Sequence, residues 1–436
     1  MIKIVTYIKD LEDKRNALQK EEAKLTAIKQ EVDKQSQFLA GEVQKSKNYE
    51  GELQKQIASL TARQQQILAQ KLASLNIPTS AYTTQGGCVD DRNIDPGFSP
   101  RYAFFTYGVP NRVGLNQWGA KGRAEAGQNA ETILNAYYGN VELKKDYNTG
   151  INITVNGTNE YGQNFSNQSW DVETYVKHIY EMPTAWPGEA LKAQAIAARS
   201  YVLAVTNNGA NSICPSQQCQ VVKQEENSQA WKDAVDATRG WVLTSGGNPV
   251  KAWFSSTHGG YVFKTSDIGW SDTAWTKNAV DASGGVSNFS DLQNNAYDKN
   301  SPWFYCDWGS RAQYNKTAWL KPDEVADIVN SLLLAKKDPS VQNHLSQPDK
   351  PNPDGVETWN QEKVKSELKS RGTTPLNSVS DISISWDNGG GRTNSITVSG
   401  DGGSYNFSGS EFKNFFNLRA PANIQIVGPL FNAEKK

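Results

Sequence analysis

The sequence EMPTAWPGEALKAQAIAARSY, residues 181–201, decides how the surrounding chain is expected to fold. Two prolines and a glycine near its start predict a turn, and the alanine-rich remainder predicts a helix from Glu189 to about Val205. Pro187 suits the helix entrance, where no backbone donor is needed, and Glu189 lies in the first turn, where the helix dipole is positive. Because alanine side chains are small, this helix can pack its backbone closely, and we expect it to be buried.

A second short helix is predicted just before the turn. Apolar side chains recur at the spacing of one helical face, at Val172, Tyr175, Val176 and Ile179. This helix leads directly into Glu181, a carboxylate on a proline-containing turn beside a buried helix. Desolvation there would raise the carboxyl pKa, as an acid/base residue requires. The sequence holds no phosphate-binding loop, nucleophile elbow or helical zinc-protease motif, so carboxylate acid/base chemistry is the prediction.

The longer stretch YVKHIYEMPTAWPGEALKAQAIAARSY, residues 175–201, resembles the signature of the SpoIID/LytB family of bacterial cell-wall proteins. That family includes lytic transglycosylases, which cleave the glycan strands of peptidoglycan, and enhancers of cell-wall amidases. The resemblance implies a transglycosylase in which the muramoyl C6 hydroxyl attacks intramolecularly and one glutamate acts as acid and then as base. It assigns this role to Glu181, with Glu189 second, because a first-turn glutamate more often serves the helix dipole. The alternative is a non-catalytic, glycan-binding enhancer of an amidase.

The family resemblance also suggests substrate-binding residues. Arg199, Ser200 and Tyr201 end the signature, and the arginine either pairs with a structural carboxylate or orients the catalytic one. Residues 252–261, AWFSSTHGGY, resemble the family's YxSTSGG loop, with histidine where serine or cysteine is usual. From this loop we expect sugar hydroxyls to bind Ser256, Thr257 and His258, with general acid/base work as the alternative for the histidine. Two further candidates, for a sugar-stacking wall, are Gln117 and Trp118, although core packing is the alternative for the tryptophan.

The order of family segments along the chain is rotated. Residues 113–120, VGLNQWGA, resemble the GVGxSQWGA segment that closes the domain in typical members, yet here they precede Glu181. Residues 382–419 resemble the hairpin and SGxEFRxxLxLRS helix that normally come just before that segment. We therefore interpret 101–430 as one circularly permuted SpoIID/LytB-like domain, with an inserted helical and loop region at about 320–372. The fold class expected is α+β, with mixed helices and antiparallel strands.

The N-terminal residues 4–77 predict a long helix followed by an irregular linker at 78–100. Apolar residues recur every seventh position, at Ile4, Leu11, Leu18, Leu25, Val32 and Leu39, and after an interruption at Ser46 again at Leu53, Leu60 and Ile67. Such a heptad predicts a coiled coil. The companion seam is weak, which leaves a marginal coiled coil or a helical hairpin bent near Gly41. The segment would serve as an oligomerising stalk or as a docking arm for a partner such as an amidase or a divisome-type protein.

The amino-acid composition bears on the partners and the location of the protein. A net charge of -1 with 21% charged residues gives no case for nucleic acid or an anionic membrane as partner. Four cysteines fit an exported protein with two disulfides, for which three pairings exist. The start of the chain lacks a signal-peptide core. We expect an extracellular or cell-envelope location, with the export signal or anchor outside this sequence.

The cysteine segment CPSQQC, residues 214–219, resembles the family's CxxxHCQVY segment, where cysteine and histidine bind zinc in some members. Gln218 stands at the histidine position, and two thiolates without a further ligand make a poor zinc site. We therefore expect no cofactor, with zinc as the alternative. A local disulfide between Cys214 and Cys219 is favoured, which leaves Cys88 and Cys306 as the second pair.

Overall fold

A computed structural model describes residues 2–82 and 88–436, with the side chains of the long N-terminal helix described in part. The chain divides into two units, Met1–Gln66 and Ile67–Lys436. Within the described residues, no helix combines the length and the apolar character that crossing a membrane would require.

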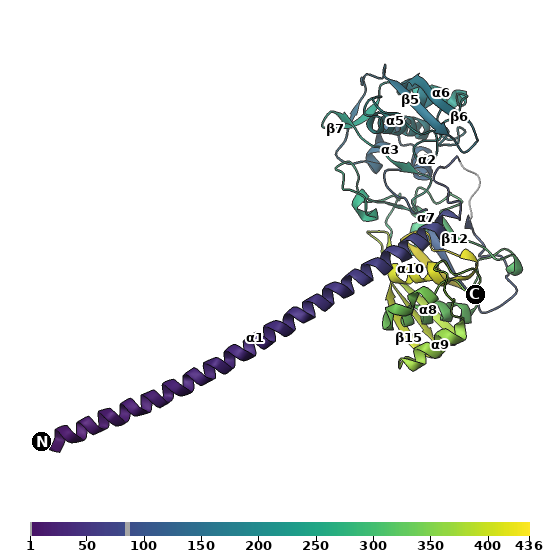
Figure 1. The fold of residues 1–436 in the computed structure, drawn as a ribbon. Coiled ribbons are helices and arrows are strands. Elements are labelled where there is room, and N and C mark those ends of the chain that lie inside the picture. Colours follow the sequence, from purple (N-terminus) through teal and green to yellow (C-terminus); the bar gives the residue numbers. More distant parts are fainter. Residues whose placement is uncertain (1, 83–87) are drawn as a thin grey trace. The chain divides into compact units, whose positions relative to one another are not determined.

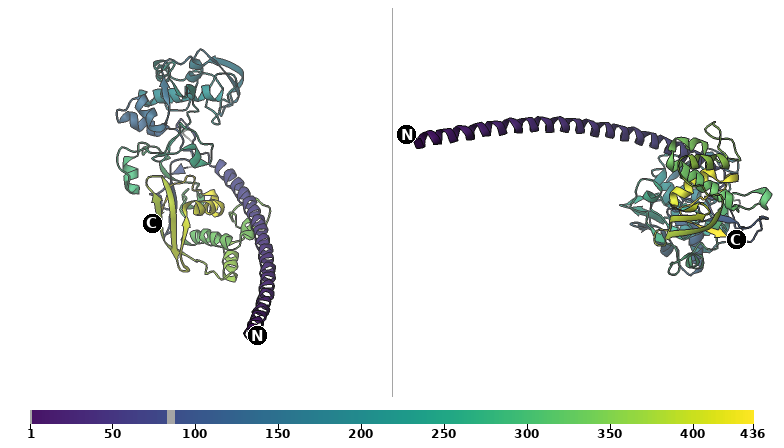
Figure 2. Two further views of the ribbon diagram at one scale, coloured as in Figure 1. Left: turned by 90° about the vertical axis from the view of Figure 1, so that its left-hand side faces the viewer. Right: turned by 90° about the horizontal axis from the view of Figure 1, so that it is seen from below.

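The first unit consists of one helix, α1 (Ile2–Ala73), whose last turns belong to the second unit. Both views of Figure 2 show an unbroken coil, so the alternative of a hairpin bent near Gly41 is wrong. Five described heptad residues in the first unit are between 51% and 73% exposed, namely Leu11, Leu18, Leu25, Val32 and Leu39, whereas Ile67, in the second unit, is 6% exposed. A helical partner would cover such a row, and the coiled coil remains a prediction.

In the second unit, one hydrophobic core surrounds α5 (Gly188–Val205). Ala193, Ala195, Ala197 and Ala198 have no accessible surface, and their small side chains let neighbouring helices approach the α5 backbone. The neighbouring helices are α2 (Gln117–Glu125), α3 (Ala130–Tyr137), α4 (Val172–Lys177) and α6 (Gln229–Ala237). Figure 1 labels α2, α3 and α6 near α5. The buried helix predicted from the alanine pattern is confirmed, as is the short helix before Glu181.

Short strands complete this part of the unit. An antiparallel hairpin is formed by β5 (Asn152–Thr158) and β6 (Asn164–Asp171). A small sheet contains β4 (Glu142–Lys144), β7 (Val242–Ser245) and β8 (Asn248–Pro249). Two further pairs are β3 (Leu115–Asn116) with β9 (Phe254–Ser255), which is parallel, and β10 (Tyr261–Val262) with β11 (Ala279–Val280). Because β3 leads into α2, its pairing with β9 fixes the QWGA segment beside the 252–261 loop.

A four-stranded antiparallel sheet joins the two ends of the predicted domain. Its order is β1 (Cys88–Val89), β12 (Tyr305–Trp308), β2 (Tyr102–Tyr107) and β16 (Phe431–Lys435). The Arg101 backbone N–H donates to the carbonyl of Lys436 at 2.7 Å, so the start and end of this region are adjacent. Adjacent ends are what a circular permutation needs, and the permutation itself remains a prediction.

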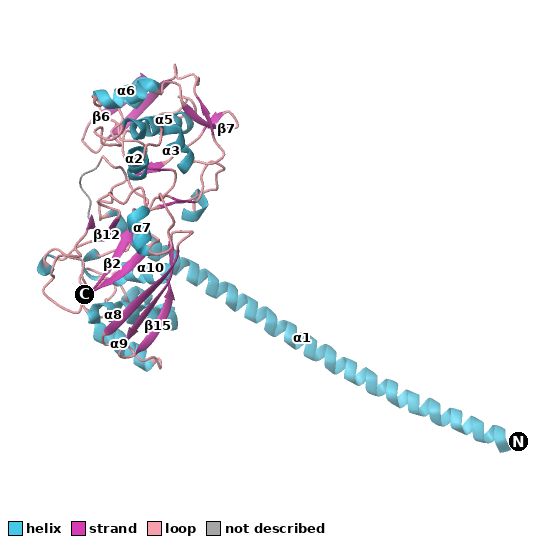
Figure 3. Ribbon diagram, turned by 180° about the vertical axis from the view of Figure 1, so that it is seen from behind, coloured by secondary structure: helices cyan, strands magenta, loops and turns pink. Residues whose placement is uncertain are grey.

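A second hydrophobic core lies under the C-terminal sheet. This antiparallel sheet contains β13 (Val379–Asp387), β14 (Arg392–Gly400) and β15 (Gly403–Ser408), drawn in magenta in Figure 3. The helices around it are α8 (Pro322–Lys337), α9 (Gln361–Ser370) and α10 (Gly409–Arg419), and α7 (Phe289–Asn295) lies elsewhere in the unit. Mixed helices and antiparallel strands confirm the α+β class.

Candidate active site

Glu181 is held in place through its own backbone. Its carbonyl accepts hydrogen bonds from the Ser80 hydroxyl at 2.7 Å, the Gln117 side-chain amide at 3.1 Å and the Tyr82 backbone N–H at 3.2 Å. The residue is only 4% exposed. Its carboxylate oxygen Oε1 accepts from the Val221 backbone N–H at 2.7 Å. Three segments that are distant in sequence therefore fix the position of one turn.

Burial gives this carboxyl an unusual proton affinity. Desolvation raises the pKa of Glu181 to about 7, against the opposing effect of the Val221 N–H, which stabilises the anion. The negative charge of Glu160 adds to the increase. Near neutral pH the carboxyl is therefore populated in both protonation states, which is the condition for a group that must give and then take a proton.

Glu181 opens onto a cavity of about 690 Å³. Its lining includes the end of α1 with the residues that follow it, and several aromatic rings. The lining residues are Ala69, Leu72, Ala73, Asn76, Ile77, Pro78, Thr79, Val109, Pro110, Asn111, Glu181, Tyr201, Gln217, Gln218, Cys219, Trp253, Phe254, Ser255 and Trp270. In the described part of the chain, Glu181 is the only charged side chain among them.

The first residues of the predicted linker are built into this site. The Thr79 hydroxyl donates to the Gln217 side chain at 2.9 Å, and the Ala81 N–H donates to the Gln117 side chain at 2.7 Å. Pro78 accepts through its carbonyl from the Ser256 hydroxyl at 2.6 Å. Residues 78–82 are therefore fixed to the site by hydrogen bonds, and Pro78 and Thr79 line the cavity.

Glu189 occupies a different environment. Burial opposes its ionisation, but hydrogen bonds from Lys192 and from the Ala130 N–H together lower the pKa of Glu189. Oε2 accepts from that N–H at 2.7 Å, and Oε1 pairs with Lys192 at 2.7 Å. Because Ala130 is the first residue of α3, Glu189 satisfies a free donor at one helix terminus while lying in the first turn of another.

Glu189→Gln is accordingly expected to leave glycan cleavage unchanged and to lower the free energy of unfolding by about 0.3–1 kcal/mol. The loss reflects a weaker acceptor for the α3 terminus and the missing Lys192 ion pair. Urea unfolding and glycan digestion, performed in parallel, measure the two effects. A loss of cleavage by a folded Glu189→Gln protein would move the acid/base role to Glu189.

Arg199 pairs with a structural carboxylate rather than with Glu181. It has no accessible surface, and its Nη2 lies 2.7 Å from Oε2 of Glu173. It also donates to the carbonyls of Trp241 at 3.1 Å and Val235 at 3.2 Å. Direct substrate contact and the orientation of Glu181, two predictions for this residue, are not what the structure shows.

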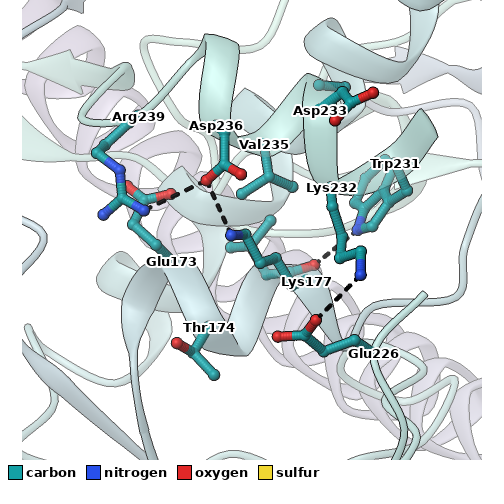
Figure 4. A network of polar contacts seen from close by, with 12 residues as sticks. Glu173, Thr174, Lys177, Glu226, Trp231, Lys232, Asp233, Val235, Asp236 and Arg239 are labelled. Atoms are coloured by element: carbon teal, nitrogen blue, oxygen red, sulfur yellow. Dashed lines mark hydrogen bonds and ion pairs between the residues drawn. The ribbon is translucent and has the colours of Figure 1, made fainter. Parts of the chain in front are cut away.

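The Arg199 pair lies beneath a polar seam between α4 and α6. Lys177 pairs with Asp236 at 2.9 Å, and the indole N–H of the buried Trp231 donates to the Val176 carbonyl at 2.8 Å (Figure 4). Arg239, which is exposed, reaches Asp236 at 3.3 Å. The buried pair and this seam together hold α4, and therefore the turn of Glu181, against the rest of the core.

Ser200 and Tyr201 differ in accessibility. Ser200 is fully buried, donating to the Ile196 carbonyl at 2.7 Å and accepting from the Leu243 N–H at 2.8 Å. A glycan cannot reach it, so its predicted substrate contact is wrong. Tyr201 is half-buried and lines the Glu181 cavity, where its predicted substrate contact remains open to test.

The 256–258 loop is also inside the protein. Ser256, Thr257 and His258 have no accessible surface, so the prediction that they bind sugar hydroxyls is wrong in this structure. Burial holds the pKa of His258 far below its usual range, and its Nε2 lies 3.0 Å from the Ser255 hydroxyl. A neutral, enclosed imidazole does not serve as the acid/base group. The loop instead supports Ser255, which lines the cavity.

Two buried aspartates organise this loop, and no local sequence pattern pointed to either of them. Oδ2 of Asp298 accepts from the Thr257 hydroxyl at 2.8 Å and from the His258 N–H at 2.9 Å. Asn116 donates at 2.9 Å to both Asp298 and Asp281. Burial raises the pKa of Asp281, and the 2.8 Å ion pair with Arg123 opposes this. Asparagine thus joins two carboxylates that lie far from it in sequence.

The QWGA segment positions the Glu181 turn through hydrogen bonds of Gln117. Gln117 is fully buried and bridges the Glu181 carbonyl to the Gln194 side chain, at 3.1 and 3.2 Å. Its role is therefore positioning, and the predicted sugar contact is wrong. Trp118 is partly exposed and meets Trp186 edge to face, with 4.7 Å between ring centroids. It is not among the residues that line the Glu181 cavity.

Both cysteine pairs are close in space. The structure joins Cys214 to Cys219 and Cys88 to Cys306. Because Cys219 lines the cavity, the first disulfide anchors the wall that carries Gln217 and Gln218. Across the described residues, no group of three or more histidine, cysteine, aspartate or glutamate side chains is placed to hold a metal ion.

Comparisons with known proteins place this region among cell-wall proteins. The family model of the stage II sporulation protein, SpoIID, matches residues 162–245, which include Glu181, α5 and Cys219. The amidase enhancer of Bacillus subtilis (strain 168) is 36% identical over 93 residues, which cover 21% of this chain and 13% of the enhancer. Stage II sporulation protein D of the same organism is 34% identical over 119 residues, covering 22% and 35%.

A protein of Brachyspira hyodysenteriae (strain ATCC 49526 / WA1) that is named uncharacterized is 32% identical over 105 residues, covering 22% of this chain and 28% of that protein. The alignments thus span about a third or less of each relative's length, and no solved structure matches the chain. The segments that suggest the permutation, near 113–120 and 382–419, lie outside the matched residues. The part of the chain that contains Glu181, residues 162–245, therefore matches the SpoIID family, and its relatives are named amidase enhancer and stage II sporulation protein D.

Proposed function

We propose that this chain cleaves the glycan strands of peptidoglycan as a lytic transglycosylase, with Glu181 as its single acid/base. One observation carries the proposal. A buried carboxyl whose pKa is raised to about 7 is the only charged side chain, among the described residues, that lines a cavity of about 690 Å³. Hydrolysis of a glycosidic bond usually requires a pair of carboxylates. A cavity with one carboxylate suits a reaction in which the substrate supplies its own nucleophile.

The proposed reaction is balanced without water. Protonated Glu181 donates its proton to the glycosidic oxygen as the bond from that oxygen to the muramoyl C1 breaks. The resulting carboxylate then accepts the proton of the muramoyl C6 hydroxyl while the C6 oxygen bonds to C1. The net change moves one proton from the C6 hydroxyl to the leaving oxygen and leaves a 1,6-anhydro ring. Glu181 ends as it began, protonated.

The products of digestion test this proposal. Peptide-free glycan strands would be incubated with the full chain, and the new ends identified by mass spectrometry. Anhydro-muramoyl ends support the transglycosylase. Hydrolytic reducing ends would mean that water is the nucleophile, which contradicts the proposed mechanism. The proposed substrate requires an extracellular or cell-envelope location.

A second function is favoured by a different observation. A relative is named amidase enhancer, Glu181 is only 4% exposed, and α1 presents a row of exposed leucines that a partner helix would cover. A glycan-binding enhancer that recruits an amidase would use these features without any cleavage. Stimulation of a purified cell-wall amidase to the same extent by wild type and Glu181→Gln, with no cleavage by either, would establish the enhancer and exclude the transglycosylase.

The pH dependence of cleavage follows from the proton affinity of Glu181. Because the reaction begins with the protonated carboxyl, we expect kcat/KM to fall about tenfold for each pH unit above a midpoint near pH 7. The rate of anhydro-product formation between pH 5 and pH 9 measures this. A midpoint near pH 4.5, the ordinary value for a glutamate, would mean that the carboxyl is solvated in the free enzyme.

A further inference from the structure

Three tryptophans gather at the rim of the Glu181 cavity. The rings of Trp253 and Trp275 are stacked, with centroids 6.2 Å apart and planes 17° from parallel. Trp270 adjoins Trp253 at 5.6 Å between centroids, tilted by 52°. We call these three residues the tryptophan platform. None of them lies in the family-matched region 162–245.

The platform is held rigidly by its backbone. The Trp253 carbonyl accepts from the Tyr138 hydroxyl at 2.6 Å and from the Leu115 N–H at 2.9 Å. The indole N–H of Trp275 donates to the Lys251 carbonyl at 3.2 Å. Since Leu115 lies in β3, which leads directly into the QWGA segment, the platform is anchored to the same framework that positions Glu181. Little conformational entropy is then lost when a ligand binds.

The loop that carries Trp270 is likewise fixed. Gly269, at a φ of 78°, ends the short 3-10 helix Thr265–Ile268, and the Trp270 N–H turns back to the Thr265 carbonyl at 3.0 Å. The hydroxyls of Thr265, Thr273 and Thr276 lie within 3.4 Å of one another. Their contacts close the loop on itself, so the indole is presented outward from a stable base.

Trp270 is 44% exposed, and among the tryptophans that the structure describes only this one is exposed. If the three indoles packed together only to stabilise the fold, we would expect Trp270 to be buried. The platform instead lines a second cavity, of about 670 Å³, together with Lys251, Gly269, Ser271 and Thr273. Trp253 and Trp270 line both cavities, so the surface runs continuously from Glu181 onto the platform.

We propose that the tryptophan platform is a glycan-binding subsite that holds sugar rings of the strand beyond the bond cleaved at Glu181. This inference rests on the proposed function and deepens it. The apolar C–H face of a pyranose ring stacks on an indole face, and its equatorial hydroxyls point sideways to polar groups. Here those groups are Lys251, Ser271 and Thr273. Because the platform continues the Glu181 cavity, its occupant is the same strand and not a separate ligand.

The test measures glycan binding without turnover. The full chain carrying Glu181→Gln would be titrated by calorimetry with peptide-free glycan strands, and separately with a single disaccharide unit. Adding Trp270→Ala should weaken long-strand binding about tenfold, while Trp270→Phe retains most of it. Disaccharide binding should not change, because one unit at Glu181 does not extend onto the platform. The matched control is Trp359→Ala, which removes an indole that stacks on His344 in the second core.

Each outcome separates the subsite from the catalytic proposal. Equal affinity of the parent and Trp270→Ala for long strands would overturn the subsite and leave the Glu181 chemistry untouched. Weaker binding by Trp270→Ala, when wild type makes no cleavage products, would keep the subsite and reject the transglycosylase. No binding of long strands by the Glu181→Gln parent would overturn the subsite directly. Urea midpoints for all variants show whether Trp270→Ala acts through folding.

Discussion

Glu181→Gln should abolish glycan cleavage, lowering kcat/KM by about 10²–10⁴-fold, the usual contribution of a general acid/base. The amide has the same shape but cannot release a proton at neutral pH. The backbone bonds that fix the turn, from Ser80, Tyr82 and Gln117 to the Glu181 carbonyl, do not involve the altered group. Anhydro-muramoyl product formation, followed by mass spectrometry, measures the loss. Full activity in the amide variant would remove Glu181 from the mechanism.

The stability of the same variant supplies an independent control. In the folded chain the pKa of Glu181 is about 7, and in the unfolded chain it returns to about 4.5. Between these two pH values the unfolded state releases a proton that the folded state keeps, so this group lowers stability as pH rises through the window. Below pH 4.5 both states are protonated and the contribution vanishes. Above pH 7 the buried anion carries a constant cost of up to about 3 kcal/mol.

Glu181→Gln should therefore be more stable than wild type at pH 8 and equally stable at pH 4. Urea unfolding at the two pH values measures the difference. The amide oxygen can still accept from the Val221 N–H, so no hydrogen bond need be lost. A variant that gains stability but loses activity would show that the buried Glu181 carboxylate lowers the stability of the fold and is needed for the reaction. A Gln variant less stable than wild type at pH 8 would show that the anion is well solvated or paired.

Arg199→Met is expected to give the largest loss of stability, about 3–5 kcal/mol, because it leaves Glu173 as a buried charge without its partner. Both side chains are nearly inaccessible, with exposed fractions of 0% and 2%. Glu173 would retain one acceptor contact, from the Gly240 N–H at 3.1 Å. The free energy of unfolding in urea measures the effect. Glycan cleavage per folded molecule should change little, since neither residue lines the Glu181 cavity.

Two further variants show whether the loss comes from the unpaired charge. Combining Arg199→Met with Glu173→Leu should recover part of the stability, because two apolar side chains can replace a buried pair at low cost. Arg239→Met, at a side chain that is 57% exposed and contacts Asp236 at 3.3 Å, should cost no more than about 0.5 kcal/mol. A double variant as unstable as Arg199→Met alone would point to lost packing instead of lost charge.

The local elements around the site could be predicted because each carries its own signal. A run of alanines after Pro187 specifies a thin buried helix, and the proline-rich turn before it places Glu181 at the end of another helix. Both predictions depend only on residues that are neighbours in the sequence, so they could be made without knowledge of the fold. The predicted contacts of the 256–258 loop were wrong because a Gly-rich polar loop looks the same in sequence whether it faces water or a buried carboxylate.

The sequence by itself determined the helix α5, the short α4 and the position of Glu181 between two helices. It left the N-terminal segment open between a straight helix and a hairpin, and the structure decided for the single helix α1. Tertiary structure alone decided the surroundings that give this carboxyl its pKa and its cavity. Ser80 and Val221, about a hundred and forty residues apart in the chain, both hydrogen-bond to Glu181. Asp298 accepts a hydrogen bond from the His258 backbone, forty residues away. No periodic pattern in the sequence predicts such long-range hydrogen bonds. They form because buried polar groups must pair with one another once the hydrophobic cores have packed.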